Sequence, residues 1–401
     1  MAGTLSRKKT PSGPVRVVIV GGGIGGLAAA LALQSPRFEV SVYEQAPELG
    51  EVGAGVGLFL NSMRVLERLG VGEQVRRNAF VGTEFRWMRT DGSVLARQAV
   101  GDDVFFPVWG VYRPDLISTL AAALPTGTLH TGHRCVSFSQ DDSSALVAFD
   151  NGVTVAADVV IAADGIHSTL RSHVVAPQPP VFSGVMVYRG VLPTARVSGW
   201  PWPHALANWG GQGKHFMVLP LHSGEWLTYV GFMPADEQLR LSRSAPGDPA
   251  MLAAEFAGWD PWVSRLISQV DTTSRLGLYD RDPLPRWTHG RLALLGDAAH
   301  AMLPHMGQGA NQAIEDGMAL ATLIRDVAIA DIPDALIRYQ QLRHDHTARV
   351  QHQSRVNGQL ADSGQLDNLF HPGVQDYDVE AHARRLCQQP DLARGPVNIR
   401  A

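Results

Sequence analysis

The order of apolar and polar positions near the start of the chain predicts a strand, a helix and a second strand. Val15–Val20 is an apolar run interrupted only by Arg16, which is typical of a strand buried in a parallel sheet. Glycines follow directly, and residues 27–33 form an alanine- and leucine-rich segment that predicts a helix. Residues 40–43 predict the next strand. Together these segments have the length of one βαβ unit, about 30 residues.

Two later apolar runs resemble the first one and also end in a glycine and an acidic residue. Residues 158–163 run into an Asp-Gly pair, and residues 292–295 run into a Gly-Asp pair. In an open α/β sheet, ligands collect at the carboxyl ends of the strands. The three strands are therefore expected to contact one cofactor, although they are far apart in the sequence.

The middle of the chain has a different pattern, in which β-branched and aromatic residues partly alternate with polar ones. This pattern predicts strands at residues 181–192, 215–221 and 226–233, separated by turn-rich segments, and hence an antiparallel sheet inserted into the α/β domain. The two-residue period of a strand would place His215, Met217 and Leu219 on one face. Residues 334–359 are polar and predict a helix, whereas the segment from residue 366 onward has no clear pattern.

Composition limits the class of protein. The chain has 401 residues, of which 45% are hydrophobic and 18% charged, as expected for a soluble enzyme of two domains. The net charge of −4 argues against a broad basic surface for nucleic acid. No apolar run reaches the roughly 18 residues of a membrane span, and residues 1–14 lack the apolar stretch of a secretory signal.

The two cysteines, Cys135 and Cys387, are isolated and do not have the spacing of a metal site. We expect no metal, and we expect a reducing cytoplasmic location.

The glycines after the first strand match a dinucleotide-binding motif. Gly21, Gly23 and Gly26 have the G-x-G-x-x-G spacing, which permits a tight turn, close approach of the backbone to a pyrophosphate, and close helix packing. The helix N-terminus attracts phosphates, and Glu44, at the end of the second strand, is placed to accept hydrogen bonds from ribose hydroxyls. This motif serves NAD and FAD equally.

Four further motifs decide between these cofactors. They are Arg113-Pro114-Asp115-Leu116, Asp164-Gly165-Ile166-His167-Ser168 continuing to Arg171, Gly296-Asp297-Ala298-Ala299-His300, and residues 304–311. Taken together and in this order, they resemble the single-component FAD-dependent aromatic hydroxylases, a family that includes salicylate hydroxylase and 6-hydroxynicotinate 3-monooxygenase. The resemblance extends from about residue 15 to about residue 358. A second dinucleotide motif, for NAD(P)H, is absent, which is typical of that family.

The resemblance implies a set of residues that bind FAD. Asp297 would bind the ribityl hydroxyls, and the helix that begins near Gly309 would stabilise negative charge on the reduced flavin. Arg113 and Asp164 would lie against the FAD, and Val136 beside its adenine. The full set expected to bind the cofactor is Gly21, Gly23, Gly26, Glu44, Val56, Arg113, Val136, Asp164, Asp297, Gly309, Ala310 and Asn311.

The resemblance also implies the fold and its division. We expect an α/β protein with a Rossmann-type FAD-binding domain around a parallel sheet, an inserted and mostly antiparallel substrate domain, and C-terminal helices. The expected ranges are a tail at 1–14, the first part of the FAD domain at 15–180, the substrate sheet at 181–284, the second part of the FAD domain with helices at 285–360, and a C-terminal segment at 361–401.

The implied reaction is hydroxylation of a small phenolic or hydroxy-aromatic acid with NADH or NADPH and O₂, through a flavin hydroperoxide. Such a site must exclude water, and it needs a base for the phenol proton. His215 and His305 are the candidate bases. Arg189 is a candidate partner for a substrate carboxylate or for the nicotinamide cofactor, and Tyr188 is adjacent to it. We expect a monomer or a homodimer.

Two departures from the family pattern argue against hydroxynicotinate as the substrate. A glycine lies within residues 52–57 where the hydroxynicotinate enzymes carry a histidine, and Leu219 replaces a tyrosine. Two other functions remain open. One is action on a larger polyketide, alkaloid or alkene by hydroxylation or epoxidation, and the other is a flavin-binding redox module without turnover.

Overall fold

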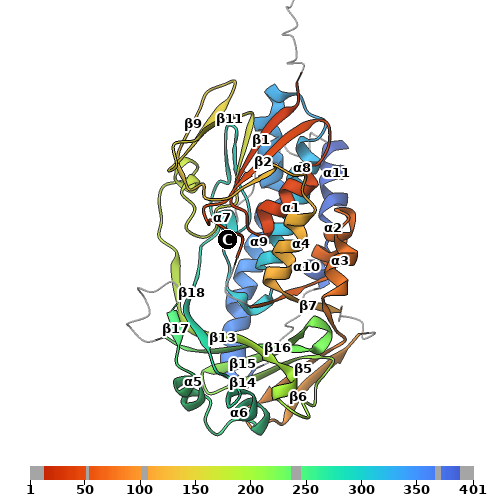
Figure 1. The fold of residues 1–401 in the computed structure, drawn as a ribbon, viewed down its shortest axis with the longest axis vertical. Helices are drawn as coiled ribbons and strands as arrows, with labels where there is room; N and C mark the ends of the chain where they lie inside the picture. The colour runs from red at the N-terminus through yellow and green to blue at the C-terminus, as the bar shows by residue number, and fades with distance from the viewer. Residues whose placement is uncertain (1–12, 51–53, 101–106, 236–244, 366–371, 389–401) are drawn as a thin grey trace, which may run out of the picture.

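The computed structural model describes residues 13–50, 54–100, 107–235, 245–365 and 372–388. Most of the expected tail at 1–14 and part of the C-terminal segment lie outside these ranges. Two large sheets dominate the described part, and the long helix α9 (Ile332–Ser363) extends from one to the other (Figure 1).

The first sheet is the predicted parallel sheet. Its strand order is β19-β20-β12-β1-β2-β8, and every pair is parallel except β19–β20. The strands are β1 (Val15–Val20), β2 (Phe38–Tyr43), β8 (Leu129–His130), β12 (Val159–Ala162), β19 (Thr288–His289) and β20 (Leu292–Leu294). The three predicted apolar strands, β1, β12 and β20, are direct neighbours, so their carboxyl ends meet at one edge of the sheet.

Helices pack on this sheet and close its apolar core. Helix α1 (Ile24–Ala32) follows β1 directly and packs against α8 (Gly309–Ile324). The remaining helices of this region are α2 (Leu60–Arg68), α3 (Gly72–Arg77), α4 (Arg113–Ala122), α7 (Asp297–His300), α10 (Pro372–Gln375) and α11 (Val379–Gln388). Helix α11 packs against α8, although no pattern in the sequence after residue 366 predicted a helix.

The second sheet is mostly antiparallel, as predicted. Its order is β17-β18-β13-β16-β15-β14-β5-β6, and only β14 and β5 run parallel. Its strands are β5 (Glu84–Arg89), β6 (Val94–Ala99), β13 (Val181–Pro193), β14 (Ala205–Gly211), β15 (Lys214–Leu221), β16 (Trp226–Pro234), β17 (Ala245–Gly247) and β18 (Thr273–Asp280). Strands β5 and β6 join this sheet from outside the expected substrate range of 181–284.

Alternation of side chains divides the second sheet into two different faces. One face packs on α5 (Pro249–Glu255) and α6 (Pro261–Ile267) and forms a dense core around Trp209, Phe216 and Tyr229. The opposite face, which carries His215, Met217 and Leu219 as predicted, borders a large cavity.

Two three-stranded sheets complete the fold. One has the order β3-β7-β4, with β3 (Gly55–Leu58), β7 (Val108–Tyr112) and β4 (Phe80–Gly82). The other has the order β11-β10-β9, with β11 (Thr154–Ala157), β10 (Ala145–Phe149) and β9 (Cys135–Gln140). Among the helices in the described ranges, none has the length and apolar character needed to cross a bilayer.

Candidate active site

A cavity of about 910 Å³ lies between the two large sheets. The segments that follow β1, β12 and β20 line one part of it, through Gly21, Asp164 and Asp297. The open face of the second sheet lines another part. The cavity therefore joins the predicted cofactor end of the parallel sheet to the predicted substrate sheet.

The three motif glycines serve different purposes in the turn after β1. Gly21 has a φ of +113°, and a Cβ there would lie 2.2 Å from the carbonyl oxygen of Ala163. A Cβ on Gly26 would lie 2.0 Å from the carbonyl oxygen of Gly21, so Gly26 serves packing and does not line the cavity. A Cβ on Gly23 would meet no protein atom within 4 Å, and Gly23 does line the cavity. At Gly23 the protein itself therefore has no need for a glycine.

Acidic side chains surround the same end of the cavity. Glu44 accepts hydrogen bonds from the backbone N–H groups of Gly22 (2.7 Å) and Ala46 (2.9 Å). Asp164 accepts from Thr169 N–H at 2.8 Å through Oδ2, and burial raises its pKa. Its buried Oδ1 has no hydrogen-bond partner within the part of the chain that the structure describes. Asp297 is exposed and lines the cavity.

The N-terminus of α8 lines the cavity through Gly309 and Ala310, but Asn311 does not. Asn311 is fully buried, and its Oδ1 accepts from Phe59 N–H at 3.0 Å. Its Nδ2 donates to the carbonyl oxygens of Gly57 and Gly307. The side chain therefore fixes the two loops that flank the cavity.

The other expected FAD contacts fall into two groups. Val56 and Arg113 line the cavity. Val136 is 52% exposed and is outside the lining, although the preceding residues Arg134 and Cys135 are part of it.

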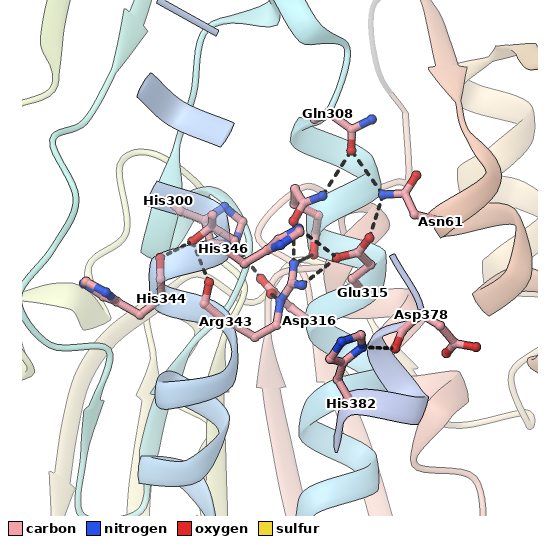
Figure 2. Close-up of polar contacts among 12 residues, drawn as sticks. Asn61, His300, Gln308, Glu315, Asp316, Arg343, His344, His346, Asp378 and His382 are labelled. Carbon is pink, nitrogen blue, oxygen red and sulfur yellow. Dashed lines mark hydrogen bonds and ion pairs between the residues drawn. The ribbon is translucent and has the colours of Figure 1, made fainter. Parts of the chain in front are cut away.

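A buried charged network connects α8 with α9 (Figure 2). Arg343 of α9 donates to Asp316 at 2.7 Å and to Glu315 at 2.5 Å, and all three side chains are fully buried. His300 Nε2 lies 2.6 Å from Asp316 Oδ2, which also accepts from Gly296 N–H. Burial alone would raise the pKa of Asp316, but His300 and Arg343 lower it to about 2. The network joins the turn before Asp297 to α8 and α9.

Two histidines meet on the substrate side of the cavity. The ring of His215, 4% exposed, stacks on Phe232 with ring centroids 3.9 Å apart. Its Nδ1 donates to Asp362 Oδ1 at 2.7 Å. His305 lies with its ring centroid 5.1 Å from that of His215.

Burial favours the neutral form of both imidazoles. Burial lowers the pKa of His215, although Asp362 opposes the shift. Burial, together with the nearby His215, lowers the pKa of His305 well below 6.5. The buried Nδ1 of His305 has no hydrogen-bond partner among the described residues. A Cβ on Gly358 would lie 2.6 Å from the His305 ring, so the missing side chain there makes room for the imidazole.

Arg189 and Tyr188 lie on opposite faces of the second sheet. Arg189 lines the cavity. Tyr188 is 1% exposed and packs in the core beside α5 and α6. Alternation along β13 turns it away from the cavity, so Tyr188 is unsuited to the catalytic role expected of it.

Comparison with known proteins identifies the family. A family model described as an FAD binding domain matches residues 14–354. The chain belongs to this family. It is 34% identical over 378 residues to 6-hydroxynicotinate 3-monooxygenase of Bordetella bronchiseptica, covering 92% of this chain and 97% of the relative. It is 35% identical over 350 residues to 3-amino-4-hydroxybenzoate 2-monooxygenase of Streptomyces platensis, covering 86% of this chain and 87% of the relative.

A solved structure extends the comparison to the fold. A salicylate hydroxylase substrate complex is 28% identical to this chain and superposes with a TM-score of 0.79, covering 97% of this chain and all of that one. The family and fold predicted from the motifs are confirmed. The chain is an FAD-dependent monooxygenase.

The residues of this flavoprotein fit FAD. The open space at Gly23, the buried unpaired oxygen of Asp164 and the helix N-terminus at Gly309 all face one cavity. Such a set suits a ligand with phosphates and hydroxyl groups. Gly21, Gly23, Glu44, Asp164 and Asp297 are the residues that would hold it.

Three polar residues on or next to the cavity wall were not predicted from the sequence. Asn208 and Trp87 line the cavity from the second sheet, whereas Asp362, near the end of α9, lies behind His215 and outside the lining. The two-residue period placed His215 on its face, but the strand of Asn208 was not predicted. Asp362 contacts His215 across 147 positions of sequence, which no local pattern reveals.

Proposed function

We propose that this flavoprotein hydroxylates a small phenolic or hydroxy-aromatic acid substrate, using NADH or NADPH and O₂. The relatives named above act, by their names, on rings that carry a hydroxyl and a carboxylate. The reaction consumes one aromatic C–H, one O₂, one NAD(P)H and one proton, and it yields the phenol, water and NAD(P)⁺. The observation that carries the proposal is the pair of neutral histidines in the cavity that would hold FAD.

When bound and reduced by NAD(P)H, the flavin supplies the electrons and the activated oxygen for this reaction. The protein binds the aromatic ring, excludes water and accepts the phenol proton.

His305 is the proposed proton acceptor for the substrate phenol. A base must be unprotonated at the working pH, and burial keeps His305 in that form. Its unpaired Nδ1 leaves one ring nitrogen open to a partner. His215 is oriented by Asp362, which fixes a proton on Nδ1 and leaves Nε2 as the acceptor nitrogen.

Apolar side chains would exclude water around this pair. Met217 and Phe232 line the cavity from the second sheet, and Leu303 lines it from the loop before His305. Water exclusion matters because activated oxygen is otherwise lost as hydrogen peroxide.

Among the described residues of the second sheet, Arg189 is the cation that lines the cavity. We propose that it pairs with an anionic group, either a substrate carboxylate or the nicotinamide cofactor. A cytoplasmic location and a monomeric or homodimeric state belong to the same proposal, and the two unpaired cysteines support the reducing location.

The proposal is tested by oxidation of NADH and NADPH by the FAD-loaded protein across a panel of phenols, aromatic acids and hydroxypyridines. We expect one structural class to accelerate the oxidation strongly and to gain one oxygen atom by mass. Acceleration without a hydroxylated product, or no acceleration by any ring in the panel, would contradict it.

A further inference from the structure

The substrate face of the second sheet carries a second polar feature beside His215, because Asn208 pairs with Met217, two residues along β15 from His215. We propose that Asn208 and Trp87 form a hydrogen-bond donor site for an uncharged oxygen acceptor on the substrate, such as an amide or ring-carbonyl oxygen. This inference rests on the proposed function and narrows its substrate class.

The register of the sheet places the two side chains next to each other. Strands β14 and β5 run parallel, and Asn208 pairs with Trp87 across them. Both residues line the cavity, as does Met217, which is paired with Asn208 on the other side. Adjacent strands are about 4.8 Å apart, so one small ligand group can reach both side chains.

Both donors are buried, and neither finds a partner among the described residues. Trp87 is 2% exposed and Asn208 is 6% exposed. Trp87 Nε1 and Asn208 Nδ2 have no hydrogen-bond acceptor within the ranges that the structure describes. Leaving a buried donor unpaired is costly, so an acceptor from a ligand would be stabilising there.

The opposite face of the same sheet provides a contrast. Trp209, the residue after Asn208, points into the core, where its Nε1 donates to Asp260 at 2.7 Å. The indole that faces the core is therefore satisfied by the protein, whereas the indole that faces the cavity is not.

The surroundings favour an uncharged acceptor. Along the sheet, Asn208 is followed by Met217, Val230 and then Arg189 on successive strands. Three strand spacings separate Asn208 from Arg189, about 14 Å, which is too far for an ion pair. A carboxylate at the two neutral donors would therefore be buried without a counter-charge from the described sheet.

The test is ligand binding to the oxidised FAD-loaded protein, followed by the change in flavin absorbance without any reductant. The probes are 4-hydroxybenzamide, 4-hydroxybenzoate and phenol. We expect the amide to bind more tightly than the acid. Asn208→Leu and, separately, Trp87→Phe should each weaken amide binding about fivefold to tenfold, the worth of one hydrogen bond, and leave phenol binding unchanged.

Met217→Leu is the matched control, because it changes the same face without removing a donor. We expect it to shift the binding of the amide and of phenol alike. Tighter binding of the acid than of the amide would overturn the inference, and so would an equal loss of phenol and amide binding in both donor variants.

Failure of this inference is distinguishable from failure of the proposed function. If the amide binds through Asn208 but no ring in the panel is hydroxylated, only the proposed function is contradicted. A hydroxylated amide whose binding ignores both substitutions contradicts the donor site only.

Discussion

The glycines around the cavity differ in what a side chain would meet at each position. At Gly21 and Gly26 a methyl group would collide with the protein backbone, so these glycines are required by the fold. At Gly23 it would collide with nothing in the described protein. If a larger residue at position 23 impairs the protein, the cause is therefore a clash with the bound ligand and not a clash within the fold.

Gly23→Ala should separate cofactor binding from stability. We expect the affinity for FAD to fall roughly tenfold to a hundredfold, because the methyl group occupies space needed by the pyrophosphate. The thermal midpoint of the FAD-free protein should not change. Flavin fluorescence titration measures the first and thermal unfolding the second. Gly373→Ala, which also meets no atom within 4 Å, is the control and should affect neither.

His305→Asn should lower kcat on the order of a hundredfold if His305 is the proton acceptor. Because the pKa of His305 is lowered, its neutral form persists as the pH falls through 6.5 and is lost only well below that value. The wild-type kcat should therefore show no loss near pH 6.5 from this group. The exposed His204 provides the control, His204→Asn, which should keep the wild-type pH profile. An unchanged kcat in His305→Asn would remove His305 from the mechanism.

Residues were predictable from the sequence where a local motif fixes the backbone. Gly21 comes directly after β1 and Asp297 comes three residues after the end of β20, and both line the cavity. Val136 was assigned by analogy alone, and its side chain lies outside the lining. Asp362 was not predictable, because its role depends on how the end of α9 meets β15.

At the scale of elements, α8 and α9 are joined by the buried charged network of Figure 2. Arg343 forms ion pairs with two fully buried carboxylates, Glu315 and Asp316. Asp316 in turn holds Gly296 and His300 at the cofactor edge of the parallel sheet. Helix α8 is thereby fixed with its N-terminus towards the cavity.

Arg343→Leu should destabilise the protein by about 3–5 kcal/mol, because it leaves buried carboxylates without their partner. Urea unfolding of the FAD-free protein measures this change. Arg384→Leu removes a surface ion pair with Glu380 and should cost no more than about 0.5 kcal/mol. Equal losses in the two variants would show that the network contributes no more than a surface pair.

Helix α9 shapes the substrate side of the cavity through Gly358. A helix-interior glycine costs about 1 kcal/mol relative to alanine, and His305 occupies the space that a side chain would fill. We expect Gly358→Ala to leave thermal stability within about 1 kcal/mol of the wild type and to lower kcat by displacing His305. Steady-state kinetics and unfolding of the same sample check both parts. A variant with full activity would show that the position of His305 is not critical.

Helices and strands could be predicted where the pattern of apolar residues within the segment itself indicates the element. The strand expected at residues 15–20 has those bounds, and the helix expected at 334–359 lies within α9. Strands β5 and β6 were not assigned to the second sheet, because β5 pairs with β14 across more than a hundred residues. Such a pairing leaves no trace in either segment alone.

At the scale of the whole molecule, the cavity is the feature that unites the two sheets. The parallel sheet supplies groups suited to a dinucleotide, and the second sheet supplies histidines, apolar walls and unpaired donors. Helix α9 contacts both sheets: the Tyr339 hydroxyl donates to the carbonyl oxygen of Leu294 in β20 at 3.1 Å, and Asp362 accepts from His215 of β15. Cofactor and substrate chemistry are therefore expected to occur in one shared cavity.

The most direct test of this claim is turnover of the FAD-loaded enzyme under oxygen-18 gas with an accepted aromatic substrate. Mass spectrometry of the product is the measurement. We expect one oxygen-18 atom in each product molecule, with little hydrogen peroxide formed, because oxygen is transferred to the ring inside the cavity that would also hold FAD. An unlabelled product, or conversion of all consumed oxygen to peroxide while the ring stays unchanged, would contradict it.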